Sequence, residues 1–179
     1  VSVNIYKPTA NAGGTTRAFA GDGTDVSAGT LKLFADGDVR ADAGLFAFSL
    51  SGFVAVSALR PSANVVNNVE AYVGRGLGEV TGDQAVITLS GAADIDAIGR
   101  SIAEATATGV AVSGGVSVNA MNAVASLAGA TRAYIGKQTT LGATSVDLMA
   151  KEETAQAKAD ITGGAGAGLV AVAALEPIA

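Results

Sequence analysis

The chain repeats itself at fixed offsets, and this repetition constrains its fold more than any single residue does. The opening string Val1–Asn4 returns at Val54–Ser57 and Val116–Asn119 and begins again at Val170, with start-to-start spacings of 53, 62 and 54 residues. All three prolines lie seven residues after a start, at Pro8, Pro61 and Pro177. Self-similarity at such a period predicts a stacked-repeat architecture, in which each unit needs its neighbours to bury its apolar face.

The repeats divide the chain into units of one continuous domain: residues 1–53, 54–115 and 116–169, with the start of a fourth unit at 170–179. The second unit is eight or nine residues longer than its neighbours. We expect the excess near residues 92–109, as an inserted loop or a strand extension. A short helix is the alternative there, because Ile95, Ile98 and Ile102 are spaced helically.

Alternation with a period of two dominates each repeat and predicts half-buried β-strands. Ordered stacking of such strands predicts an all-β fold, a right-handed parallel β-solenoid, with Val3, Val56 and Val118 facing inward. Each repeat is expected to form two coils of about 27 residues or three of about 18, which would give a rod about 30–50 Å long. An antiparallel β-sandwich is the competing architecture, and it is disfavoured because Asn-Gly hairpin signals are absent.

Composition excludes several classes of function. The chain has 24 glycines and only eight aromatic residues, and it contains no Cys, His or Trp. Thiol and imidazole chemistry are therefore excluded, and no cofactor is expected. A net charge of −5 argues against nucleic acid as a partner. The longest apolar run, Leu45–Leu59, is too short and too often interrupted by serine and glycine for a membrane span.

A column of aromatic residues is the main candidate site. The related strings around Phe19, Tyr72 and Tyr134 lie at equivalent positions of the three repeats. If their alanine neighbours face inward, these rings face outward beside the charged residues Arg17, Glu70 and Arg132. Two interpretations remain open: packing of the rings against an adjacent corner or insertion, or a contact between rods or with a ligand.

Other candidate sites have weaker support. Asp22 and Asp25 lie in a Gly-Asp-rich turn that suggests calcium, but the equivalent turns of the other repeats carry a basic residue instead, which favours a solvated turn. Paired carboxylates for glycoside hydrolysis neither repeat nor cluster, and we predict no catalytic residues. An ice-binding array would need many Thr-x-Thr rungs, whereas only Thr106–Thr108 fits.

The strings Val116–Asn119 and Arg132–Gly136, with their counterparts, resemble the repeats of leukotoxin-like filamentous adhesins, which are related in style to filamentous haemagglutinins. The resemblance covers the whole chain and implies secretion and display at the bacterial cell surface. Because the chain opens in mid-repeat, we expect it to be a segment of a longer protein.

The predicted function is therefore that of a non-enzymatic structural or adhesive rod, acting as a stalk or fibre. Its expected partners are further copies of itself, associated end-to-end or laterally, and host-cell or matrix surfaces. The alternative is a polysaccharide-acting β-helix enzyme or a phage tail-fibre segment.

Overall fold

Parallel β-strands make up the whole fold. The computed structural model describes all residues, 1–179, and contains twelve strands and no helix. The strands are β1 (Ser2–Tyr6), β2 (Thr9–Ala20), β3 (Asp25–Ala28), β4 (Leu31–Ser51), β5 (Val54–Leu59), β6 (Ser62–Val73), β7 (Ala85–Leu89), β8 (Ala92–Ser113), β9 (Val116–Ile135), β10 (Thr139–Gly142), β11 (Ser145–Ala167) and β12 (Val170–Ile178). The all-β expectation is confirmed.

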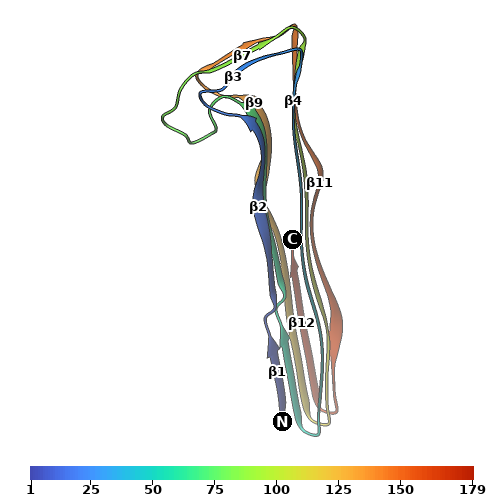
Figure 1. Cartoon of the computed structure of the whole chain (residues 1–179). Coiled ribbons are helices and arrows are strands. Elements are labelled where there is room, and N and C mark those ends of the chain that lie inside the picture. The colour runs from blue at the N-terminus through green and yellow to red at the C-terminus, as the bar shows by residue number, and fades with distance from the viewer.

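The strands form three parallel sheets (Figure 1). The entry sheet contains β1, β2, β5, β6, β9 and β12; the short sheet contains β3, β7 and β10; and the return sheet contains β4, β8 and β11. The entry and return sheets face each other. They lie close together at one end, the thin end, and are held apart at the other by the short sheet, so the molecule tapers like a wedge (Figure 1).

Each repeat passes once through the three sheets, and we call one such pass a layer. Val3 pairs with Val56, Val56 with Val118, and Val118 with Val172, which are the offsets of the sequence repeat. The expectation of two or three coils per repeat is therefore wrong, because each repeat contains strands of up to 23 residues that run without a turn. Three layers at about 4.8 Å spacing extend only about 15 Å along the stack.

The extra residues of the second repeat lie at 74–84, and not near 92–109. Val73 aligns with Ala20 and Ile135, and Val86 aligns with Asp25 and Thr140, so the additional length falls between these positions. The segment with helical spacing is part of β8, an unbroken strand paired on both sides. The insertion leaves the sheets as a loop beside the broad end of the wedge (Figure 1).

Side chains between the two long sheets are small, and towards the thin end they are polar. Alanines of the entry and return sheets make up most of the larger buried cluster, whereas the smaller cluster, which includes Ile87 and Leu89 of the short sheet, combines alanines with larger apolar side chains. Near the thin end Ser57, Ser117 and Asn119 are fully buried, whereas the neighbouring Val3 is 56% exposed. The prediction that Val3, Val56 and Val118 face inward is therefore wrong.

The reason for this inversion is that backbone carbonyl oxygens of the return sheet face the interior at this level. The Asn119 side chain spans the interior and donates hydrogen bonds from Nδ2 to the carbonyl oxygens of Gly109 and Gly164, at 2.8 Å each. Ser117 donates to the carbonyl oxygen of Ala111 at 2.6 Å. These bonds join the entry sheet to the backbone of the return sheet. Valine side chains at these positions would leave the carbonyl oxygens without these hydrogen bonds.

Two-residue links join the return sheet to the entry sheet at the thin end. A Cβ atom on Gly114 would lie 2.5 Å from the carbonyl oxygen of Gly52, and one on Gly168 would lie 2.5 Å from that of Gly114. Glycine is required at positions 114 and 168 because successive layers approach so closely there. The glycine pairs Gly13-Gly14 and Gly163-Gly164 lie within strands and not at such links.

No helix of the structure has the length and apolarity needed to cross a membrane.

Replacing Asn119 with Asp should destabilise the fold severely. The carboxylate would lose both donated hydrogen bonds and would face two carbonyl oxygens in a dry interior, at a cost of about 3 kcal/mol or more. Val118→Asp places its charge on the outer face and should cost much less. Thermal unfolding followed by circular dichroism measures both, and equal losses would contradict the assignment of the faces.

Candidate interaction surface

The three aromatic rings form one continuous stack. Phe19, Tyr72 and Tyr134 pair in register across β2, β6 and β9. Ring centroids lie 5.2 Å apart for Phe19 and Tyr72 and 5.0 Å apart for Tyr72 and Tyr134, with interplanar angles of 8° and 5°. The distances suit aromatic contact. Parallel strands therefore bring together the aromatic column predicted from the sequence.

The charged residues beside the rings form a second column. Arg17, Glu70 and Arg132 pair in register. Glu70 accepts a hydrogen bond from Nε of Arg17 at 2.9 Å and one from Nη1 of Arg132 at 3.3 Å. The charge alternates between basic and acidic from one layer to the next. This alternation stabilises the column, because like charges directly opposite each other repel. The bond to Glu70 also raises the pKa of Arg17.

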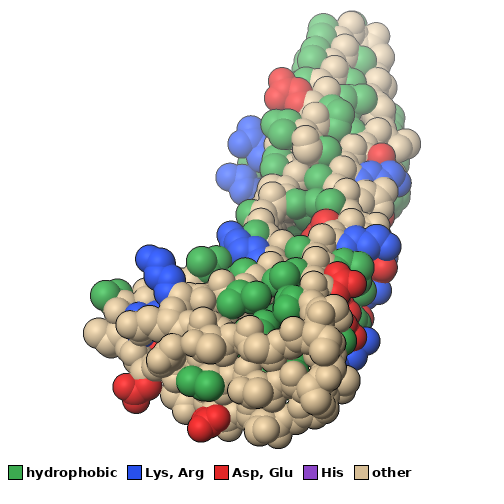
Figure 2. Space-filling view, turned by 90° about the horizontal axis from the view of Figure 1, so that it is seen from above, with side chains coloured by type: hydrophobic (Ala, Val, Ile, Leu, Met, Phe, Trp, Pro, Cys, Tyr) green, Lys and Arg blue, Asp and Glu red, His purple; other side chains and the backbone are tan.

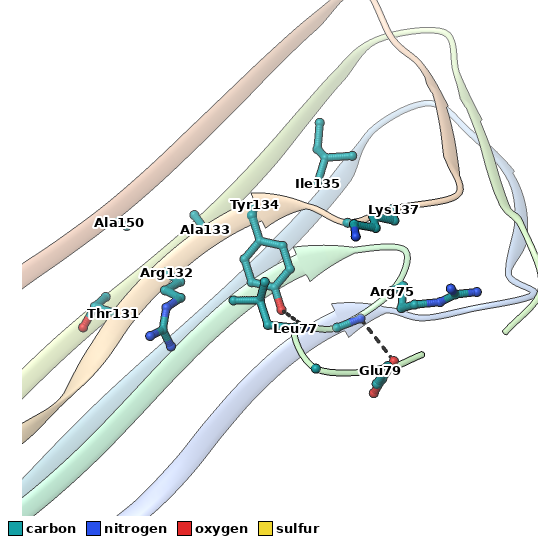
Figure 3. A pocket seen from close by; sticks show the side chains of 13 residues that line it. Arg75, Leu77, Glu79, Thr131, Arg132, Ala133, Tyr134, Ile135, Lys137 and Ala150 are labelled. Carbon is teal, nitrogen blue, oxygen red and sulfur yellow. Dashed lines mark hydrogen bonds between the residues drawn. The ribbon is translucent and has the colours of Figure 1, made fainter. Parts of the chain in front are cut away.

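The inserted loop at residues 74–84 covers the centre of the aromatic column. Tyr72 is only 3% exposed, whereas Phe19 at the end of the column is 55% exposed. The Tyr134 hydroxyl accepts a hydrogen bond from the backbone N–H of Leu77 at 3.1 Å (Figure 3). Of the two interpretations of the column, packing against an insertion therefore describes Tyr72. Open ring surface remains at the two ends of the column, on Phe19 and Tyr134.

Arg75 holds the loop against all three layers. Its guanidinium donates to the Asp22 carboxylate at 3.3 Å in the first layer and to the Gln138 side chain in the third. It also donates to two loop carbonyl oxygens, those of Val80 at 3.3 Å and Gly82 at 2.6 Å. A buried arginine with four partners fixes the path of a loop that has no strand of its own.

The Arg75 contact also bears on the predicted calcium candidates. The cation beside Asp22 is the Arg75 guanidinium, while Asp25 is exposed at the start of β3. No group of three or more Asp, Glu, Cys or His side chains is placed to hold a metal ion. The structure does not bring Asp22 and Asp25 together as ligands.

A groove of about 580 Å³ lies between the loop and the end of β9 (Figure 3). Leu77 and Glu79 form one side, and Arg132, Tyr134 and Lys137 form the other. The groove therefore combines one open ring face with charges of both signs.

Burial raises the pKa of both stacked tyrosines. For Tyr72 the negative charge of Glu79 adds to the effect. For Tyr134 the hydrogen bond from the Leu77 N–H opposes it. Both phenols are thereby held in their neutral form to higher pH than an exposed tyrosine.

A second surface, the apolar tip, was missed by the sequence analysis. At the thin end the outward side chains of both long sheets are apolar; they include Val3, Ile5, Val116, Val170 and Val172 on the entry sheet and Phe46, Phe48, Leu50, Phe53 and Val110 around the return sheet. Residues 43–59, 105–131 and 161–175 contain no charged side chain. In the view from above, the receding end of the molecule shows mostly hydrophobic and neutral atoms (Figure 2).

The signal for the apolar tip was present in the alternation of Phe46, Phe48 and Leu50. These residues were treated as part of one apolar run, although their spacing of two places all of them on a single face. Phe46 is 72% exposed. A contiguous apolar surface of this kind marks an interaction site.

Replacing Glu70 with Gln should lower the melting temperature more than Glu104→Gln does. Glu70 is nearly buried between two arginines, and its neutral replacement would leave those cations in one column without a countercharge. Glu104 pairs with Arg40 at a more exposed position and serves as the matched control. A smaller effect at Glu70 would show that the column contributes nothing to stability.

The stacked tyrosines predict a loss of stability at alkaline pH. Their folded-state pKa values lie above the unfolded value of about 10, so the folded chain binds more protons than the unfolded chain above that pH. The resulting stability is complete below about pH 10 and decreases as the pH rises through the folded-state pKa values. Ultraviolet titration should show a late-ionising component that Tyr72→Phe reduces; an unchanged titration curve would contradict it.

No protein-family model matches the chain, and neither curated proteins nor solved structures give a significant match.

Proposed function

We propose that the chain is a structural or adhesive rod segment of an exported bacterial surface or filament protein. The observation that carries the proposal is the stacking of chemically matched side chains in register across the layers. Backbone ladders, the Phe19/Tyr72/Tyr134 stack and the Arg17/Glu70/Arg132 column all run along the same direction. Such columns resist bending and shear between layers, which is the property that a stalk or fibre needs.

In this proposal the three sheets are the faces of a right-handed parallel β-solenoid with one coil per repeat. Support comes from the constant order of the entry, short and return sheets in every repeat and from the parallel pairing throughout. Right-handed crossovers are the rule for parallel strands joined within such an arrangement.

We propose that rods associate laterally through the apolar tip and not through the aromatic column. The loop at 74–84 covers the centre of the column, whereas the tip presents uncharged apolar side chains on both of its faces. The entry-sheet face of one copy can pack on the return-sheet face of another. This pairing joins unlike faces and so leaves each rod free to bind a further neighbour.

Substitution of the tip should reduce lateral association. Phe46→Ser combined with Phe48→Ser removes two rings exposed to solvent and should shift sedimentation profiles from larger species towards the monomer. Leu77→Ser combined with Val80→Ser is the matched control, since both side chains are exposed but lie on the loop away from the tip. If the control pair lowers association as much as the tip pair, the tip is not the contact.

Localisation is tested on the producing cells. Immuno-electron microscopy with an antibody against the chain should label the outer cell surface or fibres that extend from it. Labelling confined to the cytoplasm would overturn the assignment as an exported rod.

A further inference from the structure

The entry-sheet face of the apolar tip contains a hollow of about 170 Å³. Residues of three successive layers line it: Arg60 of the second layer, Ala120, Met121 and Asn122 of the third, and Ala174 and Glu176 of β12. Because three layers border the hollow, it lies on the side of the stack and not at one of its edges.

The hollow exists because small side chains recur in one outward column. Ala58, Ala120 and Ala174 pair in register across β5, β9 and β12. The neighbouring outward column, two residues nearer the tip, consists of valines, and the one on the other side includes Arg60 and Asn122. A furrow of methyl groups therefore runs between two columns of larger side chains.

A benzene-sized group matches the hollow in volume and in chemistry. A cavity of about 150 Å³ with apolar walls binds benzene. The methyl groups of Ala120 and Ala174 form the apolar part of the hollow, and Arg60 at its rim is a cation that can lie over an aromatic face. An exposed aromatic side chain is therefore a fitting occupant.

The return-sheet face of the same tip carries exposed rings at the matching depth. Phe46 is 72% exposed and Phe48 is 55% exposed. The Asn4 side chain donates a hydrogen bond across the interior to the carbonyl oxygen of Phe48 at 3.4 Å, and Asn4 is the equivalent of Asn119. Phe48 therefore lies at the level of Asn119. Phe46, two residues farther from the tip, lies at the level of Met121, which lines the hollow.

We propose that Phe46 of a second copy inserts into the hollow. This inference rests on the proposed function and specifies how the entry-sheet and return-sheet faces meet in its lateral association. Phe46 belongs to the first layer, whereas the hollow is centred on the third. The first layer of the second copy therefore lies beside the third layer of the first copy, a displacement of about 10 Å along the stack.

The remaining side chains of the two faces also correspond in this arrangement. Phe48 of the second copy lies between Val118 and Ala120, and the next layer brings Val110 of the second copy against Val172. All five side chains are apolar and at least partly exposed in the single chain. One chain thus supplies both halves of the contact, which identifies a second copy as the occupant.

Filling the hollow tests the insertion. Ala120→Trp places a ring of the same chain in the hollow and should weaken association about tenfold in sedimentation, because Phe46 of the second copy can no longer be buried there. Ala128→Trp is the matched control, since Ala128 is exposed on the same strand but lies farther from the tip. Circular dichroism confirms that both variants fold.

The ring and the hollow should also fail to add. Phe46→Ala should weaken association to a similar extent, and combining it with Ala120→Trp should cause no further loss, because both changes remove the same contact. Additive losses, or an equal loss in Ala128→Trp, would overturn the proposal.

The same measurements separate this inference from the function on which it rests. If Ala120→Trp leaves association unchanged while Phe46→Ser combined with Phe48→Ser reduces it, the insertion is wrong and the lateral contact through the tip stands. A chain that stays monomeric before any substitution overturns both. Localisation at the cell surface is decided independently by the microscopy.

Cross-linking measures the displacement between copies, since the chain has no cysteine of its own. A short bismaleimide should join a Gly44→Cys variant to an Asn122→Cys variant, because Gly44 lies two residues beyond Phe46 and Asn122 borders the hollow. Ile5→Cys should give little product with Gly44→Cys, because Ile5 lies on the same face but in the first layer. Equal yields from both mixtures, or dimers of the Gly44→Cys variant alone, would contradict the arrangement.

Discussion

Parallel pairing in register between layers is the constraint on which the rest of the structure depends. It places each side chain directly above its equivalent in the previous repeat, about 4.8 Å away. At that distance every position becomes a column whose members must be compatible. Rings stack in one column, opposite charges alternate in another, and glycines recur where the backbones approach closely. Residues at equivalent positions of successive repeats are therefore neighbours in the structure.

The same constraint shows why the register could be predicted from the sequence while the faces could not. Alternation with a period of two is unchanged when inside and outside are exchanged. The prediction chose the larger apolar side chains, such as Val118, for the interior. The thin end instead buries Asn119 and Ser117, because the facing sheet offers carbonyl oxygens there that these side chains satisfy as donors. Which groups lie opposite a side chain across the interior is a tertiary property that a local sequence pattern does not encode.

The position of the insertion was missed for a related physical reason. Spacing alone located the extra residues within the second repeat, and the helical spacing of Ile95, Ile98 and Ile102 suggested a break in β8. In the structure a strand paired on both sides overrides that local preference. The informative signals were the glycines at 74, 76 and 78, which suit a loop, and the single buried Arg75 that holds it.

Columns also explain why a stacked chain has two different kinds of interaction surface. Perpendicular to the stack, the outer faces are built from side chains, and these can be polar, charged or, as at the tip, apolar. Along the stack, the edges are built from backbone and are adhesive towards any strand unless the side chains discriminate. Within the chain, opposite charges such as Lys32 with Asp94 and Asp38 with Arg100 supply such discrimination between β4 and β8. The same column rule thus contributes to the register between the layers of one chain.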